Sequence, residues 1–141
     1  ASIISKKKRI RQMLKKVQHQ LAYNPPKKFN GSVLDGRDIG TVIMPDANVK
    51  IYLTASLNVR AMRRYKEYKK LKIKTTLSKV KSDIRKRDYE DTHRKISSLK
   101  PAKDAVLLDS SFYNTKSAFI KIDEVIRNEI KRLNATKHKS L

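Results

Sequence analysis

The sequence contains no cysteine, no tryptophan and only three glycines among its 141 residues. Without cysteine there can be no disulfide framework, no thiolate zinc site and no cysteine nucleophile. No apolar run is long enough for a helix that crosses a bilayer, and no apolar stretch follows the basic residues near the amino terminus as in a secretory signal. We therefore expect a cytoplasmic protein with no membrane contact.

Acidic residues are also scarce, and this imbalance dominates the composition. Lys and Arg number 35 against 13 Asp and Glu, which gives a formal net charge of +22. Such a charge attracts polyanions, because Lys and Arg displace the counterions condensed on phosphates. The same residues can instead cover solvated helix faces, where lysine is a good helix former. Charge alone leaves both interpretations open, in a chain long enough for one domain.

Apolar spacing predicts the order of the secondary-structure elements. Helices are expected where apolar residues recur every three or four positions, and strands where short runs are β-branched or apolar. The expected helices are Ser5–Tyr23, Leu57–Lys70, Thr76–Tyr89 and Thr115–Leu133, and the expected strands are Ser32–Leu34, Val49–Ala55 and Ala105–Leu108. Residues 134–141 read as a basic disordered tail. This alternation predicts an α/β fold with a parallel sheet.

Polar residues follow two of the predicted strands directly. Asp35, Arg37 and Asp38 come after the first strand, and Thr54 with Ser56 comes at the end of the second. In parallel sheets, ligands bind beyond the carboxyl ends of the strands. These residues are therefore the first candidates for a binding site.

Five segments carry a resemblance to a known family. They are ASIISKKKRIRQML, DGRDIGTV, PDANVKIYLTAS, VRAMRRY and RKRDYEDTHRKISSLKPAKDAVLLDSS. Together they resemble the second half of a bacterial-type cytidylate kinase, over nearly all of residues 1–130. The resemblance implies transfer of the terminal phosphoryl group of ATP to CMP or dCMP by a monomeric enzyme. It also implies that residues 1–133 form the carboxyl-terminal part of the kinase domain, with a lid segment at about 71–101.

The resemblance assigns substrate contacts to specific residues. Ser2, Arg11 and Asp38 would contact cytosine, while Arg37 and Arg94 would hold phosphate. An aspartate that accepts a hydrogen bond from the exocyclic amine of cytosine discriminates against uracil, which has a carbonyl there. Arginine suits the phosphate, because its planar fork binds two oxygens and stays charged.

Other basic residues allow two interpretations each. By resemblance, Arg87 and Asp91 would contact the ribose and help to place the phosphate, but their four-residue spacing also fits an ordinary ion pair on a helix. Arg63 and Arg64 would touch ATP, or would simply form, with Arg60, a basic outer face of their helix. The three histidines have no paired ligand spacing, so no metal site is predicted.

One departure from the family concerns the phosphate-binding loop. The glycines are Gly31, Gly36 and Gly40, and no GxxxxGK[ST] motif occurs, although such a loop cradles ATP phosphates in these kinases. The expected fold is therefore a partial three-layer P-loop nucleoside monophosphate kinase fold with a parallel sheet, without the first strand and the P-loop. We expect a fragment that is inactive alone, with ATP and Mg²⁺ held by the missing part.

Two alternatives remain at this point. The chain could be a pseudoenzyme half that needs a partner bearing a P-loop, or a basic nucleic-acid-binding or ribosome-associated structural protein. The nucleic-acid alternative rests on the charge and the basic KHKSL ending, and it lacks a recognisable pattern of base-stacking aromatic residues.

Overall fold

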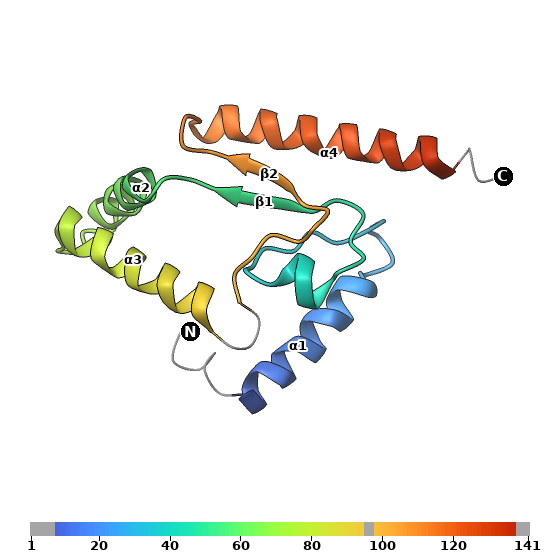
Figure 1. Ribbon diagram of the computed structural model, residues 1–141, viewed down its shortest axis with the longest axis horizontal. Helices are drawn as coiled ribbons and strands as arrows, with labels where there is room; N and C mark the ends of the chain where they lie inside the picture. Colours follow the sequence, from blue (N-terminus) through green and yellow to red (C-terminus); the bar gives the residue numbers. More distant parts are fainter. Residues whose placement is uncertain (1–7, 95–97, 138–141) are drawn as a thin grey trace.

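The computed structural model contains the four predicted helices and two of the three predicted strands, in the expected order (Figure 1). The structure describes residues 8–94 and 98–137, without the side chains of residues 8, 11, 136 and 137. In this part the elements are α1 Lys8–Tyr23, the π-helix η2 Ile39–Ile43, β1 Ile51–Thr54, α2 Leu57–Lys70, α3 Leu77–His93, β2 Val106–Asp109 and α4 Thr115–Lys137.

Two short strands form the centre of the described chain. β1 and β2 are parallel, and their register pairs Ile51 with Val106 and Thr54 with Asp109. Beyond the carboxyl end of the ladder, the Ser110 amide donates to the Thr54 carbonyl at 2.7 Å. Parallel strands require a long crossover connection, which α2 and α3 provide here. The prediction of an α/β fold with a parallel sheet is confirmed, in a helix-rich form.

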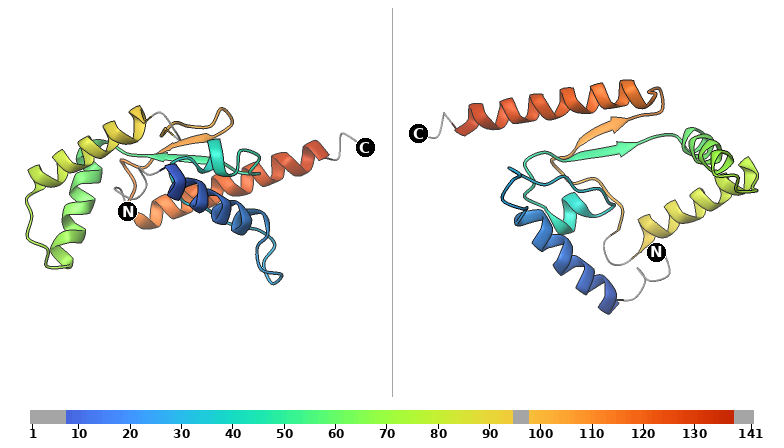
Figure 2. Two further views of the ribbon diagram at one scale, coloured as in Figure 1. Left: turned by 90° about the horizontal axis from the view of Figure 1, so that it is seen from below. Right: turned by 180° about the vertical axis from the view of Figure 1, so that it is seen from behind.

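The α2–α3 hairpin extends from the carboxyl end of β1 (Figures 1 and 2). Ser56 and Thr76 begin the two helices, since their side chains accept hydrogen bonds from the Val59 and Lys79 amides. Ala61 on α2 and Val80 on α3 are among the most buried side chains, at 1% and 3% exposure. Close packing between these helices therefore fixes the hairpin.

The two remaining helices, α1 and α4, occupy different places relative to the sheet. α1 lies next to η2, and α4 runs back alongside the two strands (Figure 2). The Tyr23 hydroxyl at the end of α1 donates to the Asp46 carboxylate, which ties α1 to the chain before β1. None of the described helices combines the length and apolar character needed to cross a membrane.

The predicted strand at Ser32–Leu34 is wrong. This segment has irregular backbone, and the Val33 side chain is fully exposed. A strand needs a hydrogen-bonded neighbour, and within residues 8–94 and 98–137 the sheet consists of β1 and β2 alone. The short apolar run led to the prediction of a buried strand, but no strand in the described chain pairs with this segment.

Two helices continue past their predicted ends. α3 runs to His93 rather than Tyr89, and α4 runs to Lys137, so residues 134–137 of the predicted tail are helical. No Gly or Pro interrupts either extension, so the helical hydrogen bonds propagate. Residues 138–141 lie outside the described chain, as do residues 5–7 of the first predicted helix.

Among the described residues, exposed large apolar side chains outnumber buried apolar ones. A groove of about 750 Å³ lies between α4 and the segments around β1, lined by Val33, Val49, Ile51, Ile122 and Ile126 among others. Phe112 and Phe119 are 92% and 70% exposed. The helices thus carry the predicted apolar stripes, but a large part of this surface is not covered by the rest of the described chain.

The end of α2 generates a prediction about stability. Lys72 adopts a φ of 56°, and the Ile73 amide donates to the Tyr68 carbonyl at 2.9 Å, the pattern of a left-handed helix cap that glycine favours. We expect Lys72→Gly to raise the free energy of unfolding by about 0.5–1 kcal/mol, because the left-handed region is strained for a residue with a Cβ.

The control for this change is Lys70→Gly, two residues earlier within α2. There, glycine should lower the free energy of unfolding by about 1 kcal/mol. Urea unfolding of the two variants measures both effects, and destabilisation by Lys72→Gly would contradict the strain at this cap.

Candidate functional site

Three arginines converge on the carboxylate of Asp91. Arg37 Nε lies 2.5 Å from Oδ2, Arg94 Nη1 lies 3.4 Å from Oδ1, and Arg87 Nε lies 3.8 Å from Oδ2. The Asp91 side chain is only 16% exposed, whereas Arg87 is 56% exposed. We call these four residues the arginine cluster. All four were singled out in the sequence, and the structure brings them together from positions up to 57 apart.

Two parts of the chain supply the arginine cluster, α3 with its C-cap and the segment before η2. Arg87 and Asp91 lie on one face of α3, and Arg94 is its C-cap residue. Arg37 comes from the segment just before η2, and its partner Asp91 is 54 residues away. The helical spacing of the α3 residues could be read from the sequence, but the approach of Arg37 could not.

η2 fixes the segment that carries Arg37. The Asp38 carbonyl accepts hydrogen bonds from the Val42 and Ile43 amides at 2.8 and 3.2 Å, and Ile43 is buried. Gly40 permits close packing here, since a Cβ at this position would lie 3.3 Å from Cδ of Lys50. The polar segment between the predicted strands therefore owes its shape to a π-helical turn anchored by one isoleucine.

The structure describes the three residues predicted to contact cytosine to different extents. Asp38 is partly buried beside Arg37 in the sequence, at the start of η2. Arg11 lies on α1, but its side chain is outside the described part of the chain, and Ser2 is outside it entirely. Their assignment to cytosine stays a prediction.

The charges of the arginine cluster favour an anion. Three guanidinium groups face one carboxylate, so the four residues together carry a net charge of +2. Arginine binds phosphate oxygens through paired charge-assisted hydrogen bonds. A phosphate dianion would balance this excess, and Asp91 holds the three donors close together.

A second group of polar residues lies at the carboxyl ends of the strands. Arg63 on α2 donates to the hydroxyl and carbonyl of Ser110 at 3.0 and 2.6 Å, and to the Tyr113 carbonyl at 2.8 Å. Arg64 pairs with Glu67 at 2.9 Å and stacks over the Tyr68 ring. Arg63 thus holds the turn after β2, while Arg64 remains on the helix surface.

The turn after β2 contains a further hydroxyl network. Asp109 Oδ1 accepts from the Ser111 hydroxyl at 2.6 Å and from its amide at 2.8 Å. These hydrogen bonds from Ser111, the side-chain one above all, lower the pKa of Asp109. The Ser111 hydroxyl also accepts from the Ser56 amide, so both strand ends meet in this turn.

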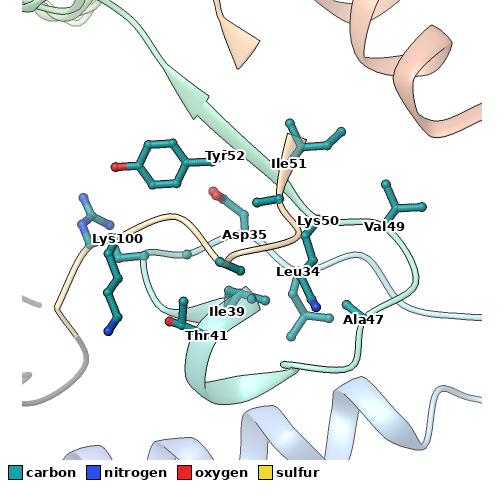
Figure 3. Close-up of a pocket in the computed structure, with 15 residues that line it drawn as sticks. Leu34, Asp35, Ile39, Thr41, Ala47, Val49, Lys50, Ile51, Tyr52 and Lys100 are labelled. Carbon is teal, nitrogen blue, oxygen red and sulfur yellow. The ribbon is translucent and has the colours of Figure 1, made fainter. Parts of the chain in front are cut away.

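Arg37 is one of the residues that line a small hollow. Figure 3 shows other side chains around this hollow, among them Asp35, Tyr52 and Lys100. Its volume is about 140 Å³, and Asp35, Tyr52 and Lys100 contribute polar groups to its wall. This volume is below the roughly 300 Å³ typical of a pocket that encloses a small organic ligand. The hollow extends the arginine cluster but does not by itself enclose a nucleotide.

Sequence reasoning missed the pair formed by Arg60 and Asp88. The guanidinium binds both carboxylate oxygens, at 2.9 and 2.7 Å, from 28 residues away. The sequence showed Arg60 as one of three arginines on a helix, and nothing in its spacing pointed to Asp88. Only the packing of α2 on α3 makes this pair.

Comparison with known proteins identifies the family of the chain. The sequence matches the protein family described as cytidylate kinase over residues 1–132. It is 45% identical to the cytidylate kinase of Streptococcus mutans over 123 residues, which are 87% of this chain and 52% of that protein. It is 46% identical to the cytidylate kinase of Ligilactobacillus salivarius over 129 residues, 92% of this chain and 52% of that protein.

A third relative, with lower sequence identity, gives the same result. The cytidylate kinase of Thermosipho melanesiensis is 40% identical over 131 residues, which are 93% of this chain and 58% of that protein. The chain therefore spans about half the length of the curated relatives it matches. The match extends through the segments that build the arginine cluster, so this chain belongs to the cytidylate kinase family.

Proposed function

We propose that this chain is the part of a cytidylate kinase that binds CMP or dCMP and closes over it. The enzyme transfers the γ-phosphoryl group of ATP to the monophosphate and produces CDP or dCDP. The observation that carries this proposal is the convergence of Arg37, Arg87 and Arg94 on Asp91. Family membership supports it, since the relatives compared above are cytidylate kinases.

The arginine cluster binds the phosphate of the monophosphate in this proposal. Arg37 and Arg94 donate to its oxygens, while Arg87 and Asp91 contact the ribose and position the phosphate. Phosphoryl transfer depends mainly on positioning and on neutralising charge, and it asks little covalent chemistry of the protein. Asp91 keeps the arginines gathered before the substrate arrives, so less ordering is needed on binding.

The base is read by Asp38, Arg11 and Ser2 in the same proposal. Asp38 directly follows Arg37 and is the N-cap residue of η2, so the base and phosphate contacts come from one short segment. A carboxylate accepts from the cytosine amine and finds no donor at the same place on uracil. Residues 71–101 act as the lid, because they carry three members of the arginine cluster on α3 and at its end.

ATP is the phosphoryl donor in this proposal, with Arg63 and Arg64 as its predicted contacts. Arg64 is the more accessible of the two, because Arg63 donates to Ser110 and Tyr113. Mg²⁺ accompanies ATP in such reactions. Within the described chain, no group of three or more His, Cys, Asp or Glu side chains could hold a metal ion, so we assign no step to the ion.

The absence of a glycine-rich phosphate loop from the sequence leads to a prediction about turnover. We expect the purified 141-residue chain, mixed with ATP, Mg²⁺ and CMP, to form no CDP above the uncatalysed background. Chromatography of the nucleotides measures the product, and a cytidylate kinase that contains a P-loop is the positive control. Sustained CDP formation by the chain alone would show that this sequence cradles the ATP phosphates in another way.

Removal of one arginine tests the phosphate contact. We expect Arg94→Ala to weaken CMP binding by about 10- to 100-fold, because a charge-assisted hydrogen bond to phosphate is lost. Binding of cytidine, which lacks the phosphate, should not change. Calorimetric titration at fixed ionic strength measures both ligands, with Lys79→Ala as a control that removes an exposed positive charge from α3. If Arg94→Ala and Lys79→Ala lowered CMP affinity equally, the effect would come from the net positive charge and not from a specific contact of Arg94 with phosphate.

Base recognition is tested separately with Asp38→Ala. We expect the preference for CMP over UMP to fall toward equality, because the acceptor for the cytosine amine is removed. The two nucleotides have the same charge, so the net charge of +22 cannot produce a preference between them. Arg94→Ala should weaken both nucleotides alike. An unchanged preference in Asp38→Ala would contradict the assignment of this residue to the base.

A further inference from the structure

Arg60 links two elements through a single guanidinium group. Its Nε donates to the Ala55 carbonyl at 2.9 Å, just after β1. Its two Nη atoms donate to the two carboxylate oxygens of Asp88 on α3, at 2.9 and 2.7 Å. This bidentate geometry fixes the direction as well as the distance of the contact. Arg60 therefore ties α3 to the carboxyl end of β1.

The point where α3 is tied lies within the arginine cluster. Asp88 follows Arg87 directly and precedes Asp91 by three residues, which is less than one helical turn. Arg37 reaches Asp91 from a different segment, with a contact of 2.5 Å between Nε and Oδ2. A rotation or shift of α3 would separate these atoms. The contact between Arg37 and Asp91 thus depends on where α3 lies relative to the sheet.

The exposure of the pair argues for a geometric role. The Arg60 and Asp88 side chains are 36% and 39% exposed, so solvent screens their attraction and the pair adds little to global stability. By contrast, the pair of Lys79 with Asp83 lies entirely within α3 and cannot fix the position of that helix. Of these two pairs on α3, one is local and the other reaches the sheet.

We propose that Arg60 is a positioning residue for phosphate binding, acting through Asp88. It contacts no substrate. It holds α3 so that Arg87, Asp91 and Arg94 meet Arg37 in the geometry that a phosphate requires. This inference rests on the proposed function above, and it adds a role for a pair of residues that neither substrate recognition nor the hairpin core explains.

The test compares two isosteric changes on the same helix. Asp88→Asn removes the charge and one of the two acceptors that Arg60 uses, whereas Asp83→Asn breaks the local pair with Lys79. We expect Asp88→Asn to weaken CMP binding by roughly tenfold, as a small misplacement of the binding groups would do. Cytidine binding should stay unchanged. Asp83→Asn should leave both affinities unchanged, and Arg60→Lys, which keeps the charge without the fork, should lie between.

A distance measurement separates this inference from the proposed function. The sequence has no native cysteine, so spin labels can be placed at exposed Arg85 on α3 and exposed Phe112 after β2 by cysteine substitution. Electron paramagnetic resonance then reports the distribution of distances between α3 and the carboxyl end of the sheet. Asp88→Asn should broaden or shift this distribution, and Asp83→Asn should not.

Each combination of results has one meaning. If Asp88→Asn matches Asp83→Asn in either measurement, CMP affinity or distance distribution, the positioning role is wrong. If the unmodified chain binds CMP no better than UMP and cytidine, the proposed function is wrong, and a changed distance distribution would then show only that the pair of Arg60 and Asp88 holds α3 in place, without a role in phosphate binding. Weaker CMP binding together with a changed distribution confirms both.

Discussion

The carboxylate of Asp91 is the contact on which the candidate site depends. Three guanidinium groups would repel one another if they were placed together without a counter-charge. One partly buried carboxylate, 16% exposed, allows them to approach from α3 and from the segment before η2. The same carboxylate leaves enough positive charge for a phosphate. A single acidic residue thus brings the three arginines together and neutralises only one of their three positive charges.

The parallel strand pair determines where this cluster can form. β1 and β2 end side by side, and the α2–α3 hairpin begins at that edge, so α3 has to return toward the segment that carries Arg37 (Figure 1). Hydroxyl and guanidinium groups of Ser110, Ser111 and Arg63 join the strand ends to α2 and to the turn after β2. The β1–β2 hydrogen bonds and the polar contacts at the carboxyl ends of the strands therefore together determine where the α2–α3 hairpin begins.

Net charge and specific geometry have different roles in this chain. A charge of +22 attracts any polyanion, and its effect weakens as salt increases. The arginine cluster differs from this background because its donors are held in fixed positions by a shared carboxylate. In the function proposed above, the arginine cluster holds the phosphate, whereas the choice between CMP and UMP, which carry the same charge, depends on Asp38. The abundant lysines supply attraction, and a few arginines supply geometry.

The sequence by itself determined the order of the four α-helices and of β1 and β2, the helical faces, and the resemblance that pointed to the cytidylate kinases. Local rules suffice for these features, because apolar spacing and capping residues such as Ser56 act over a few positions. Ser32–Leu34 shows their limit: apolar residues favoured a strand, but a strand depends on a neighbour elsewhere in the chain.

Only the tertiary structure decided which charged residues meet. Arg87, Asp91 and Arg94 share a face by helical spacing, but the contact of Arg37 with Asp91 joins residues 54 apart, and that of Arg60 with Asp88 joins residues 28 apart. Because the sequence contains many arginines and several carboxylates, many different ion pairs are conceivable from the sequence alone. The packing of α3 against α2 and the sheet edge selects among them, because an ion pair forms only where two side chains are brought within reach.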